Sequence, residues 1–218
     1  IKAYETVKQK EKIIKSGNEF MALNEVGKRV TESVERYFYN MGQSDRLEDY
    51  NWEFILIDDK ETLNAWCMPG GKIAFYSGIL DVTANNDGIA SVMGHEIAHA
   101  VARHSVERAS QSVAINVGKT ILDIALEGAL SSTSADDYLV DLGIFLPFNR
   151  LQESEADYLG LAFMTMAEYD NNEAYKVWER MKKAQKTSTP EFLSTHPSPK
   201  NRIQKIKNWI PEVNARFS

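Results

Sequence analysis

The sequence predicts a single α+β domain, built mainly from helices that surround one small antiparallel β-sheet. Three observations lead to this prediction. The 218 residues, 43% of them hydrophobic, suit one core and require no second domain. Apolar residues recur at helical spacing over most of the chain, whereas residues 52–77 hold aromatic and β-branched runs between turn signals. We therefore expect residues 1–218 to form one unit with a short sheet and many helices.

The part before the sheet is expected to be helical. Residues 1–17 form an N-terminal extension whose lysines are interleaved with an acid in KQKEKIIK, as on a solvated helix face. From Asn18, which we interpret as an N-cap, Leu23, Val26 and the apolar residues after them recur at helical spacing as far as Gly42. The pattern predicts an amphipathic helix.

Three strands are predicted next. WEFILI at 52–57 is rich in aromatic and branched residues and is followed by two aspartates. NAWCM at 64–68 runs into the turn Pro69-Gly70-Gly71, and KIAFYS at 72–77 follows that turn. Together these strands indicate a small antiparallel sheet.

Helices are predicted for most of the remaining chain. The cluster Asn85-Asn86-Asp87 is typical of a helix cap, and a helical pattern runs from it through Ser110. Residues 111–149 are expected to be a helical insertion and are a candidate cover for a cleft. Helical patterns lie at about 113–130, 135–146, 151–168, 172–186 and 199–209.

Composition excludes several classes of function. The net charge of −6 provides no basic field that would collect phosphates, so nucleic acid is not expected as a partner. Cys67 is the single cysteine, which excludes an intramolecular disulfide and a thiolate metal site. No uninterrupted run of about 18 apolar residues is present. The first residue is Ile1 rather than Met, which indicates a trimmed or mature chain whose signal or lipid anchor would lie outside it.

Residues 92–104, VMGHEIAHAVARH, carry three of the four histidines and the strongest functional motif. His95 and His99 are four residues apart on a predicted helix, so both imidazoles project from one face and can bind a single ion. Glu96 is offset by about 100°, which places it beside the ion, where it can take a proton from a bound water. Two hydrogen-bonded histidines without a metal are the alternative, but the motif favours a zinc site.

The same stretch does not supply a third ligand. A histidine six residues after His99 is excluded because that position is Ser105, and the glycine that accompanies such a histidine is replaced by Ala102. His104 lies nine residues after His95, about 180° round the helix. We expect His104 to face away from the ion and to have a packing or hydrogen-bonding role.

A carboxylate from another segment is the candidate for the missing ligand. In RLQESEADYLGLAF at 150–163, Glu153 and Asp157 are four residues apart on a predicted helix, and Glu155 points off their face. Glu153 can complete a tetrahedral set, and Asp157 can orient a ligand histidine. Capping and helix-dipole stabilisation are the ordinary explanation of an acidic helix start. The HEIAH motif favours the metal site instead.

These motifs together resemble a known family. HEIAH at 95–99, followed about fifty residues later by ESEAD and then by THPSPKNRI, resembles the M48 metallopeptidases, the group that includes the Ste24 and HtpX proteases. NAWCMPGGKIAFYSGIL at 64–80 is similar to the family's two strands and Pro-Gly turn before the active-site helix. The likeness covers about residues 20–210 and is closest to the soluble branch, typified by bacterial periplasmic peptidases and the catalytic domain of the mitochondrial Oma1 type. It implies a zincin-like fold with the sheet beside the active-site helix.

The resemblance assigns a role to each site residue. It implies one zinc ion per chain with His95, His99 and Glu153 as ligands, Glu96 as general base and Asp157 as the acid that orients a ligand.

The resemblance also adds two residues that spacing alone does not identify. His196, in the His-Pro loop, is expected to approach the zinc and either to stabilise the transition state or to occupy the metal in a latent form. Arg202 matches the arginine that follows this loop, with a catalytic role or a structural capping role.

The predicted function is zinc-dependent endopeptidase activity on unfolded or extended polypeptides. A zinc-activated water would lose its proton to Glu96 and attack a peptide carbonyl. An extended substrate would add to the edge of the sheet, unless the candidate strand only completes that sheet. The strand in question is formed by Lys72, Ile73, Ala74, Phe75 and Tyr76.

The resemblance further implies a place in the cell envelope, in the periplasm or anchored to a membrane and facing it, and a part in protein quality control. Polypeptides are the expected partners, and any membrane attachment would be peripheral or through a lipid outside this chain. The alternative function is a latent, chaperone-like or binding module with a metalloprotease fold, whose zinc site is capped by residues 111–149 or by the His196 loop.

Overall fold

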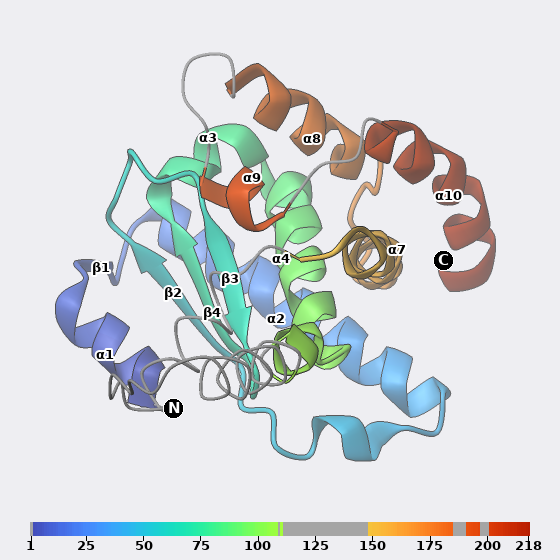
Figure 1. Ribbon diagram of the computed structural model, residues 1–218, viewed down its shortest axis with the longest axis horizontal. Helices are drawn as coiled ribbons and strands as arrows, with labels where there is room; N and C mark the ends of the chain where they lie inside the picture. Colours follow the sequence, from blue (N-terminus) through green and yellow to red (C-terminus); the bar gives the residue numbers. More distant parts are fainter. Residues whose placement is uncertain (1, 109, 111–147, 185–190, 197–200) are drawn as a thin grey trace, which may run out of the picture.

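The computed structural model of the chain describes residues 2–108, 110, 148–184, 191–196 and 201–218. Within these ranges the α+β prediction is confirmed, since helices surround one small sheet (Figure 1). The predicted helices at 113–130 and 135–146, and nearly all of the candidate cover at 111–149, lie outside the described residues. None of the described helices combines the length and the hydropathy needed to cross a membrane.

The sheet is mixed rather than wholly antiparallel, which corrects the prediction. It contains β1 (Ile13–Ile14), β2 (Glu53–Ile57), β3 (Ala65–Met68) and β4 (Lys72–Tyr76) in the order β1-β2-β4-β3. β1 pairs with β2 and β3 pairs with β4 in antiparallel fashion, but β2 and β4 are parallel. The reason is that the chain passes from β2 to the outer position of β3 and then returns through the predicted Pro-Gly turn, so β4 fills the gap between them.

This order also corrects the predicted substrate edge. The strand of Lys72, Ile73, Ala74, Phe75 and Tyr76 is β4, which is paired on both sides and has no free edge. Among the described residues, the free edge on this side of the sheet belongs to β3, because β3 occupies the outer position.

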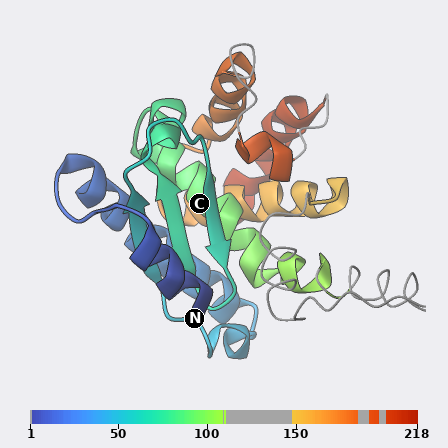
Figure 2. The same ribbon diagram turned by 60° about the vertical axis from the view of Figure 1, so that its left-hand side comes forward.

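Each face of the sheet is covered by different helices. The N-terminal extension forms α1 (Lys2–Lys10) and then β1, a strand that the sequence did not indicate. α1 lies against one face (Figure 2), where the buried Tyr4 ring meets the Trp66 ring edge-on at 6.2 Å between centroids. The opposite face packs against α2 (Asn18–Asn40) and α4 (Asn86–Val101), which enclose the main hydrophobic core.

The helix starts agree only partly with the predicted caps. α2 begins at Asn18 itself, and its N-cap is Gly17 with a positive φ of 100°, so Asn18 is not the cap. α4 begins as predicted, with the Asn85 side chain accepting a hydrogen bond from the backbone N–H of Gly88 at 2.8 Å. The short elements η1 (Ser44–Leu47), η2 (Ser77–Ile79) and α3 (Leu80–Thr83) connect the larger ones.

The C-terminal part of the chain closes the core with four helices. They are α7 (Arg150–Met166), α8 (Glu173–Ala184), the short α9 (Glu191–Thr195) and α10 (Arg202–Phe217). α10 continues beyond the predicted end near residue 209 and through Pro211, because Ile210 and Val213 on either side of the proline are buried against the core.

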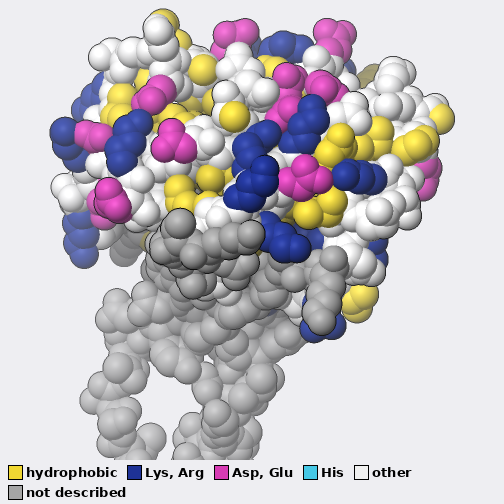
Figure 3. Space-filling model, turned by 90° about the horizontal axis from the view of Figure 1, so that it is seen from above, with side chains coloured by type: hydrophobic (Ala, Val, Ile, Leu, Met, Phe, Trp, Pro, Cys, Tyr) yellow, Lys and Arg dark blue, Asp and Glu magenta, His cyan; other side chains and the backbone are white. Residues whose placement is uncertain are grey.

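The face of the molecule that is seen from above in Figure 3 has mixed charges. In Figure 3, lysine and arginine side chains lie among aspartates and glutamates, and no histidine is visible among the coloured residues. All four histidines are in fact buried, each exposing 5% or less of its surface.

Candidate metal centre

Two helices meet at a pair of glycines and form the base of the candidate site. A Cβ atom placed on Gly94 of α4 would lie 2.9 Å from the carbonyl oxygen of Gly160 on α7. A Cβ atom placed on Gly160 would lie 2.9 Å from the backbone nitrogen of His95. Because neither residue has a side chain, the two backbones touch, and the first turn of α7 comes within reach of the histidines on α4.

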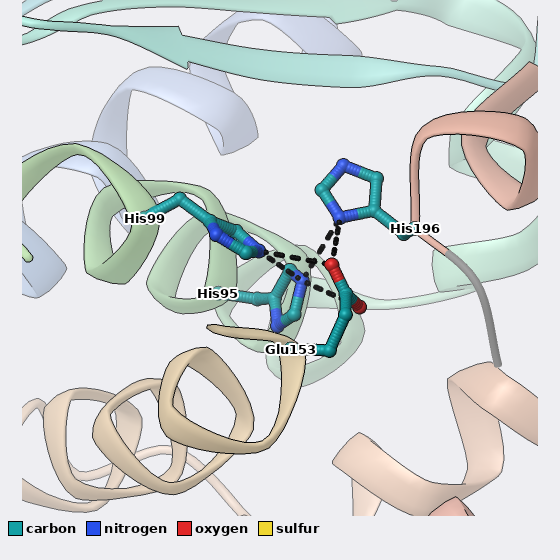
Figure 4. A group of neighbouring side chains, drawn as sticks. All are labelled: His95, His99, Glu153 and His196. Atoms are coloured by element: carbon teal, nitrogen blue, oxygen red, sulfur yellow. Dashed lines mark hydrogen bonds and ion pairs between the residues drawn. The ribbon is translucent and has the colours of Figure 1, made fainter. Parts of the chain in front are cut away.

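Four donor side chains converge above this contact (Figure 4). His95 and His99 project from one face of α4, as their spacing predicted, and Glu153 reaches them from the start of α7. His196 follows α9 and approaches from the other side. One ligand atom from each residue lies within 4.8 Å of the others, and all four residues are buried.

The spacing of these atoms fits a zinc ion. Nε2 of His95 lies 3.1 Å from Nε2 of His99 and 3.2 Å from Nδ1 of His196. Oε1 of Glu153 lies 3.3 Å from Nε2 of His99 and 3.0 Å from Nδ1 of His196. Ligands about 2.0–2.1 Å from a tetrahedral zinc ion lie about 3.3 Å apart. One proton cannot bridge three ring nitrogens whose lone pairs face each other, whereas a cation among them can bind all three.

The protonation states suit metal binding. Burial lowers the pKa of His95, His99 and His196 below the usual value, which favours the neutral imidazole that can act as a ligand. Burial alone would raise the pKa of Glu153, but His196 and Arg202 lower it, and the carboxylate stays ionised. The site therefore presents neutral nitrogens and one carboxylate.

Glu96 lies beside the four donors without joining them. Its Oε1 has no hydrogen-bond partner among the described residues and lies 3.4 Å from Nε2 of His196. Burial, together with the charge of Glu153, raises the pKa of Glu96 well above its usual range. A divalent cation nearby would act in the opposite direction. The position of Glu96 agrees with the 100° offset expected from the sequence.

Asp157 and Arg202 contact two of the donors, His95 and Glu153, and each other. Oδ1 of Asp157 lies 3.1 Å from Nδ1 of His95 and accepts a hydrogen bond from Nη2 of Arg202 at 2.6 Å. Arg202 also donates to Oε2 of Glu153, and its guanidinium lies 3.5 Å from the centre of the Trp178 ring. Burial raises the pKa of Asp157 to about 6, although Arg202 opposes this shift. Arg202 thus contacts two buried carboxylates rather than acting as a helix cap.

His104 is outside the donor set, as predicted, but it packs behind His99 instead of lying on the opposite face of a continuous helix, which corrects the predicted placement. Its Nδ1 lies 2.9 Å from Nδ1 of His99, on the side of that ring opposite to Glu153. The prediction assumed a regular helix, but α4 ends at Val101, and Arg103 has a positive φ of 60° that turns the chain back. The expected hydrogen-bonding role of His104 agrees with this contact.

Aromatic rings that the sequence reasoning did not identify pack against the donors. The Phe148 ring stacks on His99 with centroids 3.6 Å apart, and the Phe192 ring stacks on His196 at 4.3 Å. Phe148 lies two residues before α7 and Phe192 lies within α9, and neither lies on a periodic pattern that would have identified it.

A small pocket lies between the donors and β3. Glu96 and His196 lie on one side of it, and the strand from Ala65 to Met68 lies on the other. Arg108 and Phe148 line one end, where the guanidinium lies 3.3 Å from the centre of the phenylalanine ring. Burial lowers the pKa of Arg108 to about 10, which leaves it positively charged at neutral pH.

Comparison with known proteins places this geometry in context. The family model described as "Peptidase family M48" matches residues 26–210. The "Mitochondrial metalloendopeptidase OMA1" of Schizosaccharomyces pombe is 42% identical over 174 residues, which are 78% of this chain and 50% of that protein. The protein of the same name from Saccharomyces cerevisiae is 37% identical over 178 residues, with the same coverage. The "Beta-barrel assembly-enhancing protease" of Escherichia coli is 27% identical over 174 residues, 72% of this chain and 34% of that protein.

The chain thus spans about half the length of the two yeast proteins and about a third of the bacterial one.

Proposed function

The chain belongs to peptidase family M48, and we propose that it is a zinc-dependent endopeptidase that cleaves unfolded or extended polypeptides. The observation that carries this proposal is the convergence of four buried donors beside a carboxylate oxygen without a described hydrogen-bond partner and beside β3, the outermost described strand on that side. A purely structural metal site requires neither the carboxylate oxygen nor the neighbouring strand.

In this proposal His95, His99 and Glu153 hold the zinc ion. When bound, the ion supplies a Lewis acid that polarises the scissile carbonyl and lowers the pKa of a water molecule. Oδ1 of Asp157 lies 3.1 Å from Nδ1 of His95, where this carboxylate favours a proton on Nδ1 and leaves Nε2 unprotonated for the ion.

Glu96 moves the protons of the reaction. Its carboxylate accepts a proton from the attacking water and later passes that proton to the nitrogen of the leaving amine. The Oε1 atom is suited to this role because no described residue occupies it with a hydrogen bond.

The substrate lies along β3 rather than along β4. Tyr76 N–H donates to the carbonyl of Asn64 at 3.1 Å, which marks this pair as hydrogen-bonded. Because bonded and non-bonded pairs alternate, Ala65 and Cys67 direct their backbone polar groups toward the free edge. The carbonyl of Leu63, on the same side, accepts a bond from Phe192 N–H at 3.2 Å, so α9 limits one end of this edge. An extended peptide can add to the remainder.

A latent form of the same enzyme is the second candidate, and one observation favours it. The His196 ring has Nδ1 at the fourth corner of the donor set and Nε2 3.4 Å from Glu96. It therefore lies between the other three donors and Glu96, where water and substrate would have to bind. In this form His196 must move before hydrolysis begins.

The names of the relatives favour a role in protein quality control near a membrane. Two are named as mitochondrial proteins and one as a protease that enhances β-barrel assembly. We propose a place in the cell envelope. Fractionation of cells that express the full-length gene product tests it, and recovery in the cytosolic fraction alone would contradict it.

The decisive test of the activity is Glu96→Gln. We expect the variant to bind one zinc ion per chain, as the wild type does, and to cleave casein at least about 100-fold more slowly, since a general base contributes 10²–10⁴-fold. Zinc content is measured by atomic emission and cleavage by peptide release. Glu61→Gln, a change of the same kind at an exposed position, is the control and should alter neither quantity. Unchanged cleavage by Glu96→Gln would exclude Glu96 as the base.

A further inference from the structure

The two ligand histidines on α4 are supported in different ways on the side away from the donors. Nδ1 of His95 contacts a carboxylate directly, at 3.1 Å from Asp157. Among the described residues, Nδ1 of His99 contacts no carboxylate, and its partner is Nδ1 of His104 at 2.9 Å. His104 continues the contact, because its Nε2 lies 3.4 Å from Oε2 of Glu155.

The carboxylate at the end of this chain fixes the direction of every hydrogen bond in it. An ionised Glu155 can only accept, so Nε2 of a neutral His104 carries the proton. Nδ1 of His104 is then an acceptor, and His99 must donate to it from Nδ1. A neutral imidazole has a single N–H, so Nε2 of His99 is left unprotonated, and this is the atom that faces Glu153 at 3.3 Å.

Local backbone geometry is what brings His104 to this place. In a regular helix, the five residues from His99 to His104 would rotate His104 by about 500°, which is equivalent to 140°, so the two rings would not face each other. The left-handed conformation of Arg103, with φ of 60°, instead returns the chain against the back of the His99 ring. A non-glycine residue in this conformation is uncommon and costs energy, so the surrounding contacts must hold it there. His104 itself is 3% exposed.

We propose that His104 is a positioning residue, and that the chain from Glu155 through His104 to His99 sets the tautomer and orientation of the second zinc ligand. This inference rests on the proposed zinc site. It gives α7 a third contribution to the centre, since Glu153 is a ligand, Asp157 orients His95 directly, and Glu155 orients His99 through one intervening ring.

A role of His104 as a direct ligand does not fit the geometry. The atoms that converge on the donor site belong to His95, His99, Glu153 and His196. The Nδ1 atom of His104 meets the opposite side of the His99 ring, and its other nitrogen is directed toward Glu155.

Nuclear magnetic resonance on the wild-type protein tests the tautomers without any substitution. The chain has four histidines, so two-bond ¹⁵N–¹H spectra of the imidazole rings can be assigned in the zinc-loaded protein. We expect a protonated Nδ1 on His99, and on His104 a protonated Nε2 with an unprotonated Nδ1. A proton on Nδ1 of His104 would overturn the proposal.

Paired substitutions at His104 separate positioning from packing. Asn places an amide oxygen near the position of the histidine Nδ1 and can accept the same bond, whereas Leu fills the space and cannot. Competition with a chromophoric chelator should show zinc affinity about 10–100-fold weaker for His104→Leu, the usual effect of removing a partner of a ligand histidine. His104→Asn should remain within about threefold of the wild type, and Glu155→Gln, at a side chain 59% exposed, should have an effect between these two.

The outcomes distinguish this inference from the proposed function. If the wild type binds no zinc in the same titration, the zinc site itself is wrong. If the wild type binds zinc and His104→Leu binds it equally well, the positioning role is wrong. An equal loss for the Leu and Asn variants, with the unfolding midpoint lowered alike, would assign His104 to packing alone and would also contradict the proposal.

Discussion

The candidate centre is built by two regions that are held in place in different ways. The helix pair α4 and α7 supplies three of the donors, and its spacing is fixed by backbone contact between Gly94 and Gly160. The C-terminal wall, which we define as α9, His196 and Arg202, reaches the centre only through side chains. Its His196 and Arg202 side chains contact Glu153 and Asp157 of the helix pair through hydrogen bonds and ion pairs.

The difference indicates that the two regions have separate roles, one in positioning the donors and the other in controlling access to them. Close-packed backbones have no alternative arrangement nearby, so the helix pair determines where an ion lies. Polar side-chain contacts can be exchanged for others of similar energy, because an imidazole that leaves one acceptor can donate to another or to water. The C-terminal wall is therefore the part that can regulate access to the remaining face of the ion.

Arg202→Met should have the largest effect on stability. It leaves Asp157 and Glu153 buried without their cation, and breaking a buried ion pair in this way costs about 3–5 kcal/mol. Denaturant unfolding of the metal-free protein measures the loss. Saturating zinc should restore part of it, since a bound cation again faces Glu153. Arg36→Met, at an exposed arginine, serves as the control and should cost less than about 1 kcal/mol. Equal losses for both variants would mean that Arg202 does not stabilise the buried carboxylates.

Gly160→Ala tests the helix pair. The added methyl group would lie 2.9 Å from the backbone nitrogen of His95, so the helices must separate, at a cost of about 1–3 kcal/mol. We expect zinc affinity to fall as well, because Glu153 moves with α7. In the control Gly42→Ala, the φ of 66° is unfavourable for alanine but nothing lies within 4 Å of the new Cβ. That variant should lose about 1 kcal/mol and keep its zinc affinity. Unchanged affinity in Gly160→Ala would show that the spacing of the helices is not critical.

His196→Ala tests the C-terminal wall. If the imidazole occupies the fourth position, its removal should weaken zinc binding about tenfold, equivalent to 1.4 kcal/mol, and increase casein cleavage because the base becomes accessible. Metal competition and peptide release are the two measurements. Gln204→Ala, at an exposed position of α10, is the control and should alter neither. Slower cleavage with unchanged zinc affinity would instead indicate that His196 stabilises the transition state.

Cys67→Pro should have the smallest effect and concerns the strand opposite the C-terminal wall. Proline removes a backbone N–H that we assign to the free edge, so the pairing of β3 with β4 should survive. One lost hydrogen bond to substrate corresponds to about 1 kcal/mol, or roughly a fivefold increase in KM. Trp66→Pro removes an N–H assigned to the β4 side and should instead destabilise the protein. An unchanged KM for Cys67→Pro would indicate that substrate does not bind along β3.

The sequence was most informative where function depends on local spacing. Helical periodicity was sufficient to predict that His95 and His99 share one face of α4 and that Glu96 is offset from that face, because all three lie within a regular helix. It failed for the contact between His104 and His99, because His104 lies three residues beyond the end of α4 and a single left-handed residue, Arg103, changes the direction of the chain.

Features that depend on contacts distant in sequence were not predictable in this way. The strand order places β4 between β2 and β3, and no property of KIAFYS distinguishes a central strand from an edge. Likewise, His196 reaches the donors through the path of α9, and it was anticipated only from the family resemblance. Glu153 is intermediate, since its helix was predictable but its approach to α4 depends on Gly94 and Gly160.

The glycine contact also has a consequence for protein engineering. Gly94 directly precedes His95, and Gly160 follows Glu153 by seven residues, about two helical turns, so each glycine lies close to a donor along its own helix. Grafting only the histidines and glutamates onto another pair of helices would place the carboxylate too far away by the thickness of the added side chains. The smallest transferable unit of this site therefore includes two residues that have no side chain at all.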